Sequence, residues 1–168
     1  HWMNRVMTYL TPGKQRLEYA DGEKRVLEFQ AGTPLWSAAG GVHTSQNLGG
    51  PFRVIEVELN KKAGPAAPPL MLDPVKVAPR NYTVEFDEPQ ARVIRARIDG
   101  KQQVPMHEHG PNRVVVFLTD AHLRVIDDSG VSSELKVEAG TVRWSGAARR
   151  REENLSSAPF EVIAVELK

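Results

Sequence analysis

The sequence predicts an all-β protein, and three observations support this expectation. The apolar runs are short and rich in β-branched and aromatic residues, which is typical of strands. Turn signals built from glycine, proline, aspartate and asparagine separate these runs at short intervals. No long segment shows the periodicity of an amphipathic helix. Many short strands with regular turns indicate a sandwich or a barrel.

The chain contains nearly the same sixty residues twice. Residues 1–60 align with residues 109–168 at a constant offset of 108 without a gap, and 22 positions are identical. Asn4-Arg5-Val6 returns at 112–114, for example, and Trp36-Ser37 returns at 144–145. A repeat of this kind indicates one supersecondary unit present in two diverged copies.

In the first copy, strands are expected at residues 5–10 and 53–59. The second of these alternates apolar and charged side chains over part of its length, as in a half-buried strand. Thr11-Pro12-Gly13 and Asp21-Gly22 are turn signals between them. The first unit therefore covers residues 1–60.

A connector follows at residues 61–76. Its composition, with Pro65, Pro68 and Pro69 close together, favours a stiff, extended chain rather than a packed element. The connector separates the first unit from the second, which covers residues 77–168.

In the second unit, strands are expected at residues 82–86, 91–98, 113–118 and 160–167, with turns at 99–100 and 127–130. The strand-like sequence from Val77 to Met106 precedes the repeated part and has no counterpart in the first copy. If the duplication was complete, roughly 30 residues of N-terminal strands are missing upstream of His1.

Composition excludes several classes of partner. The 22 basic and 21 acidic side chains nearly cancel, so no global field points to nucleic acid or to an anionic membrane. The apolar runs are too short for a transmembrane helix. No cysteine is present, which excludes disulfides and thiolate metal sites and leaves cytoplasmic and exported locations open. No signal peptide is visible at the start.

His107-Glu108-His109 is the first motif that could carry chemistry. Side chains alternate along a strand, so both imidazoles are expected on one face and Glu108 on the other. Two imidazoles on one barrel wall, with a third from another strand, can bind a divalent metal.

These residues resemble motifs of the cupin superfamily, and the repeat resembles a two-copy bicupin. The family's first motif is Gly, then His-x-His, then Glu after three or four residues. Its second motif is Gly-x5-Pro-x-Gly-x2-His-x3-Asn. The first motif is matched by Gly100, His107 and His109, and the second by Gly32, Gly40, His43 and Asn47.

The resemblance implies a cupin-like jelly-roll β-barrel for each unit. It also implies a divalent transition metal, such as Fe, Mn, Zn or Ni, bound inside a barrel. The metal candidates are His107, His109, His43 and His1, because His1 aligns with His109.

Both copies depart from the family pattern. Arg151 aligns with His43, and the position of the metal-binding glutamate falls on Arg113 or Val114 in one copy and on Arg5 or Val6 in the other. An inward arginine could replace the charge of the metal and bind a carboxylate or phosphate, or it could be structural. The candidate ligand-binding residues are therefore Arg113, Arg151 and Asn47.

Three functions remain open at this point. The first is binding of a small, anionic ligand in a barrel with degenerate metal sites. The second is a metal-dependent cupin enzyme, of the dioxygenase or isomerase type, that uses the retained histidines. The third is a scaffold for oligomerisation, and a homodimer is expected because cupins commonly pair through edge strands. Trp36 and Trp144, which share one repeat position, are expected to pack in the core.

Overall fold

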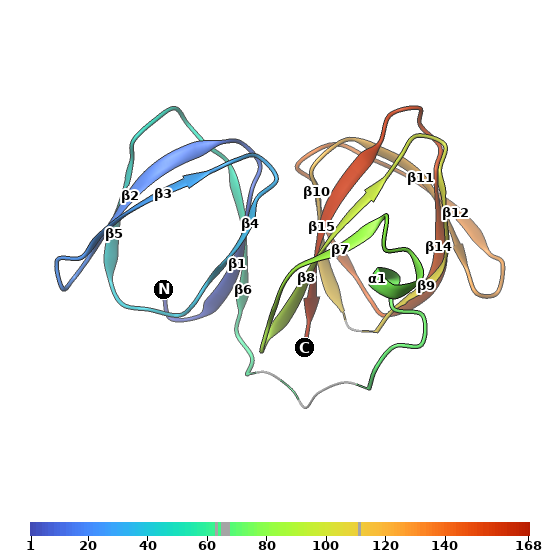
Figure 1. Cartoon of the computed structure of the whole chain (residues 1–168), viewed down its shortest axis with the longest axis horizontal. Coiled ribbons are helices and arrows are strands. Elements are labelled where there is room, and N and C mark those ends of the chain that lie inside the picture. Colours follow the sequence, from blue (N-terminus) through green and yellow to red (C-terminus); the bar gives the residue numbers. More distant parts are fainter. Residues whose placement is uncertain (63, 65–67, 111) are drawn as a thin grey trace. The chain divides into compact units, whose positions relative to one another are not determined.

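The computed structural model describes residues 1–62, 64, 68–110 and 112–168 and is built almost entirely of strands, which confirms the all-β prediction (Figure 1). The chain divides into two compact units, His1–Lys62 and Ala63–Lys168. Among the described residues, no helix has the length and apolar character needed to cross a membrane.

The first unit consists of two three-stranded antiparallel sheets. One has the order β4-β1-β6 and the other the order β3-β2-β5. The strands are β1 (Asn4–Tyr9), β2 (Gly13–Tyr19), β3 (Lys24–Phe29), β4 (Pro34–Ser37), β5 (His43–Asn47) and β6 (Val54–Leu59).

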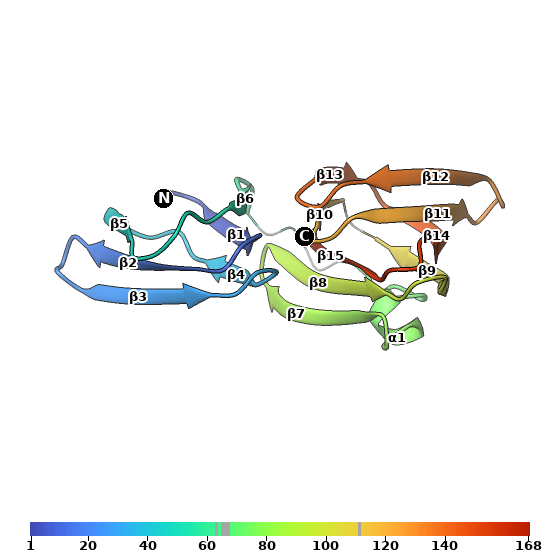
Figure 2. The same ribbon diagram turned by 90° about the horizontal axis from the view of Figure 1, so that it is seen from above.

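The second unit contains a five-stranded sheet, in the order β13-β10-β15-β8-β7, and a four-stranded sheet, in the order β12-β11-β14-β9. Figure 2 shows β11 beside β12 and β7 beside β8, as their pairing requires. The elements are α1 (Pro74–Val77), β7 (Tyr82–Glu88), β8 (Ala91–Ile98), β9 (Gln103–His109), β10 (Arg113–Phe117), β11 (Ala121–Asp127), β12 (Ser132–Val137), β13 (Val142–Ser145), β14 (Ala148–Asn154) and β15 (Phe160–Leu167).

The repeated parts of the two units pair their strands in the same register at most positions. Arg5 lies opposite Glu58 on β6, and Arg113 lies opposite Glu166 on β15. Both pairs are related by the offset of 108. In the second unit β15 also pairs with β8, and β14 also pairs with β9. Among the described residues, β6 pairs only with β1 and β5 only with β2.

Part of the predicted connector is packed and begins a short helix. Residues 63 and 65–67, within the predicted proline-rich run, lie outside the described residues. Leu72 and the following residues are packed, because the backbone N–H of Glu108 on β9 donates to the Leu72 carbonyl at 2.8 Å. Asp73 caps α1 by accepting from the backbone N–H of Val75, and Pro74 occupies the first turn, where its missing N–H has no consequence.

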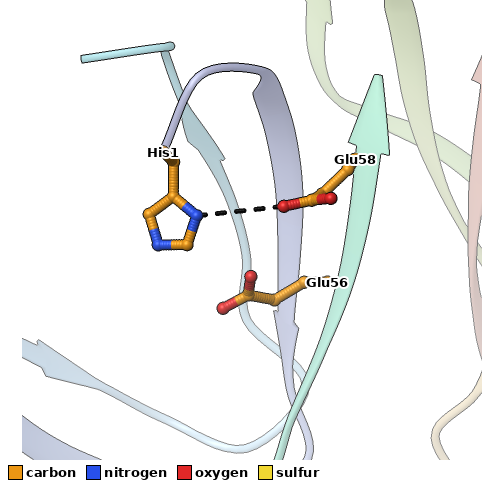
Figure 3. Close-up of side chains that lie close together, drawn as sticks. All are labelled: His1, Glu56 and Glu58. Atoms are coloured by element: carbon orange, nitrogen blue, oxygen red, sulfur yellow. Dashed lines mark ion pairs between the residues drawn. The ribbon is translucent and has the colours of Figure 1, made fainter. Parts of the chain in front are cut away.

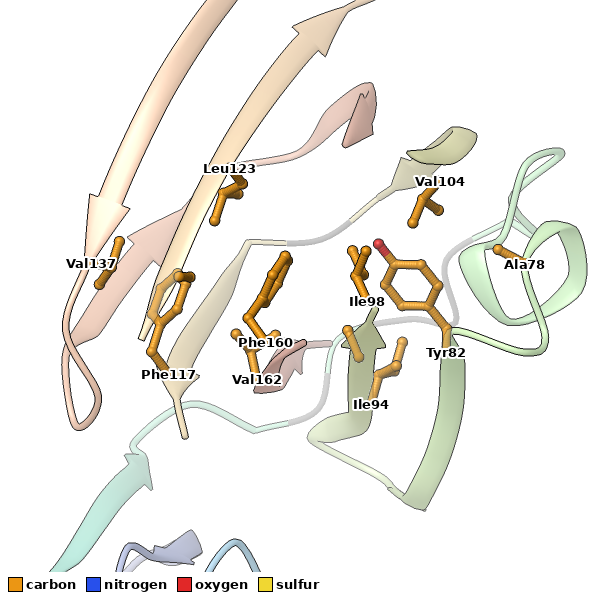
Figure 4. Close-up of a cluster of buried hydrophobic side chains, with 12 residues drawn as sticks. Ala78, Tyr82, Ile94, Ile98, Val104, Phe117, Leu123, Val137, Phe160 and Val162 are labelled. Atoms are coloured by element: carbon orange, nitrogen blue, oxygen red, sulfur yellow. The ribbon is translucent and has the colours of Figure 1, made fainter. Parts of the chain in front are cut away.

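Each unit has its own apolar cluster. In the first, Tyr9 stacks on Phe29 with ring centroids 3.6 Å apart, and Met7 completes the buried cluster. In the second, the cluster is larger and its side chains come from both sheets and from the residue that ends α1 (Figure 4). Its labelled members are Ala78, Tyr82, Ile94, Ile98, Val104, Phe117, Leu123, Val137, Phe160 and Val162.

Gly100, the glycine of the first motif, is required by a close approach of two loops. A Cβ at this position would lie 1.9 Å from the backbone carbonyl oxygen of Ser157, so the backbone itself would have to move. We expect Gly100→Ala to destabilise the protein by about 2 kcal/mol or more, because overpacking against backbone cannot relax by a rotamer change. Urea unfolding measures this change.

Gly41→Ala is the matched control for this prediction, because nothing lies within 4 Å of a Cβ at Gly41. Its free energy of unfolding is expected to stay close to that of the wild type. Equal effects of the two substitutions would contradict the steric explanation.

Candidate functional site

His107 and His109 lie side by side inside the second unit. They are 0% and 3% exposed, and their ring centroids are 5.1 Å apart. Both side chains point to one face of β9, as the alternation along a strand predicts. Glu108 points to the other face, where it pairs with Arg149 at 3.5 Å.

The tautomer of His107 follows from its partners. Its Nδ1 lies 2.9 Å from the Pro105 carbonyl oxygen, which can only accept, so Nδ1 carries the proton. Its Nε2 lies 3.2 Å from the Tyr82 hydroxyl oxygen. That hydroxyl donates to Glu152 Oε2 at 2.9 Å, so the three side chains form one buried polar group.

His109 is held by a chain of charged side chains. Its Nδ1 donates to Glu166 Oε1 at 2.9 Å, and Glu166 Oε2 accepts from Arg92 Nε at 2.8 Å. Arg92 also donates to Asp73, the residue that caps α1. Burial lowers the pKa of His109 to about 4, so the ring is neutral at pH 7.

Glu152 is an ionised carboxylate in the interior. Burial raises its pKa, but the neighbouring Arg150 guanidinium and the two imidazoles outweigh burial and bring the pKa of Glu152 to about 2. Its Oε1 lies 2.6 Å from Arg150 Nη2. Glu152 is therefore a buried carboxylate that is paired with the half-buried Arg150.

Two arginine side chains in this unit have a buried N–H group without a hydrogen-bond partner among the described residues. Arg113 is 1% exposed, and its Nη1 donates to the Gly146 carbonyl at 2.8 Å. Arg113 Nη2 and Arg150 Nε are buried, and neither finds a hydrogen-bond partner among the described residues. Burial lowers the pKa of Arg113 to about 10, and the charge of Arg150 adds to this effect. Arg113 thus remains a cation at pH 7, and none of the described acidic side chains forms an ion pair with it.

These groups open onto a cavity of about 170 Å³. One part of its wall is polar, with Tyr82, His109, Arg113, Arg150 and Glu152. The rest is mainly apolar and includes Ile94, Val115, Phe117, Leu123, Phe160 and Val162. The volume equals that of about six water molecules in the liquid, which suits a small organic molecule.

Arg150, and not Arg151, takes the position of His43. His43 lies opposite Tyr19 in the first unit, and Arg150 lies opposite Asp127, the residue 108 positions after Tyr19. Arg150 comes 107 residues after His43, so the alignment shifts by one residue in this strand. Because side chains alternate along a strand, the shift reverses which residue points inward. Arg151, which the sequence predicts to bind ligand, is exposed, and Arg150 is the residue that lines the cavity.

Asn47 and Trp144 are both exposed. Asn47 holds its own turn by donating to the Gly50 carbonyl and accepting from the Gly49 backbone N–H. Asn154, its counterpart after the one-residue shift, is buried and donates to three backbone carbonyls. Trp144 is 62% exposed, whereas core packing was expected. It lies opposite Val114 on β10 and is among the residues that line the cavity.

The first unit carries a related but different cluster. His1 lies 3.8 Å from Glu58, as His109 pairs with Glu166 in the second unit (Figure 3). Arg5 donates to His1 Nε2 and, at 3.0 Å, to Glu56 Oε2. The His43 ring lies 5.7 Å from that of His1. In the first unit the arginine therefore has an acidic partner in Glu56.

The side chains present do not fit a metal ion well in either unit. In the second, Arg113 follows the His-x-His motif after three intervening residues and Arg150 stands at the position of His43. Guanidinium groups are not metal ligands. Within the described residues, His1, Glu56 and Glu58 are the group whose ligand atoms lie within 4.8 Å of one another. Arg5 binds two of these three side chains, so a cation would have to displace it.

The sequence alone did not identify Tyr82, Arg92, Arg150, Glu152 and Glu166 as site residues. Glu166 was visible as one of the positions conserved between the copies, where Glu58 is its counterpart. Arg150 and Glu152 were not identified because the alignment shifts by one residue in this strand, and a gap-free alignment cannot show such a shift. Tyr82 and Arg92 lie before the repeated residues 109–168, so the alignment with residues 1–60 contained no information about them.

The comparisons with solved structures show the cupin fold. The neighbours include a cupin 2 conserved barrel domain protein from Leptotrichia buccalis, with TM-score 0.56, 12% identity and coverage of 100% of this chain and 75% of that one. The oxalate decarboxylase of Lactobacillus farciminis, solved as a formate complex, matches with TM-score 0.62, 12% identity and coverage of 100% and 71%. The oxalate decarboxylase of Bacillus subtilis, which has Mn(II) centres, matches with TM-score 0.59 and 10% identity.

This chain spans 64% of the Bacillus subtilis enzyme, and the match covers 100% of this chain. No protein-family model matches the sequence, and no curated protein matches it. At these levels of identity the likeness concerns the fold alone.

Proposed function

We propose that the chain is a two-copy cupin whose second unit binds a small organic anion through Arg113 and Arg150. The observation that carries this proposal is the pair of buried N–H donors, Arg113 Nη2 and Arg150 Nε, which have no partner among the described residues. Leaving a buried donor unpaired costs about 1–3 kcal/mol, and more when the group is charged. A bound anion removes that penalty.

The charges around the cavity support an anionic ligand. Its lining includes three arginines, with Arg143 as the third, and one glutamate. Glu152 is already paired with Arg150 and Tyr82, whereas Arg113 has no carboxylate partner in the part of the chain that the structure describes. An oxygen of the ligand can accept from each arginine, in the charge-assisted geometry that favours carboxylates and phosphates.

The degenerate motifs fit the same proposal. In the second unit both departures from the metal-binding pattern are arginines, at positions 113 and 150. Two fixed guanidinium groups supply the positive charge that a metal ion would otherwise contribute. The protein then needs no metal at this site to hold an anion.

Titration calorimetry tests the proposal with acetate, hexanoate, oxalate and inorganic phosphate on protein treated with EDTA. We expect at least one of these anions to bind, and Arg150→Ala to weaken that binding at least tenfold, because a charge-assisted bond is worth about 1.5–3 kcal/mol. Arg151→Ala is the control, and its affinity is expected to equal that of the wild type.

Two results would contradict this function. One is that none of the four anions binds. The other is that binding appears only after a divalent metal is added back, which would favour a metal-dependent enzyme instead.

A further inference from the structure

We infer that the ligand is a small monocarboxylate with an apolar body, and that its carboxylate lies where the Glu56 side chain lies in the first unit. This inference rests on the proposed anion-binding function and names the class and orientation of the anion. Three observations support it. They concern the partner that Arg113 lacks, the cavity beside Ala164 and the change of polarity along the strands.

The first observation is the partner that Arg113 lacks. Arg5 lies opposite Glu58 and also reaches Glu56, two residues back on the same face of β6. Arg113 lies opposite Glu166 in the same register, but the residue two positions back on β15 is Ala164. Glu166 itself is occupied by His109 and Arg92. The second unit therefore retains the arginine and has lost the carboxylate that satisfies it.

The second observation is that the cavity extends to the position where a glutamate side chain would lie. Ala164 lines the cavity, and it lies opposite Val115, as Glu56 lies opposite Met7 in the first unit. The volume that a glutamate side chain would fill at this position is therefore part of the cavity. A carboxylate from a ligand can take that place beside Arg113.

The third observation is the change of polarity along the strands. On β10 the side chains that line the cavity run from Arg113 through Val115 to Phe117, a span of about 13 Å. On the neighbouring β15, Ala164 is followed by Val162 and Phe160. A ligand whose carboxylate contacts Arg113 therefore extends its remaining atoms mainly among apolar side chains. Arg143 also lines the cavity, but it is an exposed residue opposite Val115 and not at the Phe117 end. A second charge at the far end of the ligand would therefore be unpaired.

Three carboxylates test this inference on the unmodified protein. We expect hexanoate to bind at least tenfold more tightly than acetate, because its additional methylene groups become buried. We expect adipate, which has the same carbon chain with a second carboxylate at the far end, to bind at least tenfold more weakly than hexanoate. Equal affinities for acetate and hexanoate, or tighter binding of adipate, would overturn the inference while leaving the anion-binding function in place.

The position of the carboxylate is tested by Ala164→Glu. We expect the introduced side chain to pair with Arg113, to reduce hexanoate affinity at least thirtyfold and to raise the thermal midpoint of unfolding. Ala164→Gln has the same size without the charge, so it should block hexanoate without raising the midpoint.

Hexanoate binding at wild-type affinity in Ala164→Glu would show that the carboxylate lies elsewhere. Midpoints that change equally in the two variants would likewise exclude a specific pairing with Arg113. If Ala164→Glu fails to fold, the comparison of the three carboxylates on the wild type still decides the ligand class.

Discussion

Arg113→Met is expected to abolish carboxylate binding and, at the same time, to stabilise the protein. Arg113 is a buried cation without an acidic partner, and its pKa is lowered to about 10 by burial and by Arg150. A pKa that falls from the usual 12.5 to about 10 corresponds to about 3 kcal/mol by which the fold disfavours the charged form. An apolar side chain of similar length removes this penalty.

The net gain is smaller than that figure, because the hydrogen bond from Arg113 to the Gly146 carbonyl is lost. We therefore expect the free energy of unfolding at pH 7 to rise by about 1–3 kcal/mol, measured by urea denaturation. Calorimetry with hexanoate on the same sample should show no binding. A residue whose removal improves stability and removes binding is retained for function.

Arg5→Met is the matched control in the first unit. Arg5 contacts Glu56 at 3.0 Å and also donates to Ser37, so its removal leaves an acidic side chain without its partner. We expect this variant to be less stable than the wild type. Equal loss of stability in both variants would contradict the proposal that Arg113 stays unpaired until a ligand binds.

Acidification is expected to destabilise the protein through Glu152. The pKa of Glu152 is about 2 in the folded state, because Arg150 and the imidazoles outweigh the effect of burial, and its usual value is 4.5. A carboxyl group with a lowered folded pKa contributes stability that is fully present above the unfolded pKa. This contribution disappears as the pH falls from about 4.5 to about 2 and amounts to about 3 kcal/mol.

Unfolding measured by urea between pH 2 and pH 7, on wild type and Glu152→Gln, isolates this contribution. The lowered pKa values of Glu166, Asp73 and His109 produce slopes of the same sign. Those of Glu166 and Asp73 are common to both proteins, whereas the charge of Glu152 acts on His109, so the difference reports Glu152 together with its coupling to His109. The wild type should be more stable than Glu152→Gln at pH 7, and the difference should vanish near pH 2. A difference that does not vary with pH would show that Glu152 stabilises the fold only by packing.

The fold class could be predicted from the sequence because strands have a local sequence pattern. Alternation of apolar and charged residues and the turns between the runs depend on neighbours along the chain, and residues 53–59 are a clear case. The same alternation predicted that His107 and His109 share a face. Gly100 could be identified as a motif residue from the sequence. The steric reason for a glycine there could not, because it is the backbone of Ser157, which lies 57 residues further along the chain.

The sequence by itself determined that the protein is built of strands, that residues 109–168 align with residues 1–60, and that Arg113 takes the position of Arg5 in this alignment. Only the tertiary structure decided that Arg150 points inward and Arg151 outward, and that Arg5 has Glu56 as a partner while Arg113 has Ala164 beside it. The physical reason is register. A shift of one residue in β14 reverses the face of every side chain, and charges meet across strands whose pairing is set by packing rather than by order along the chain.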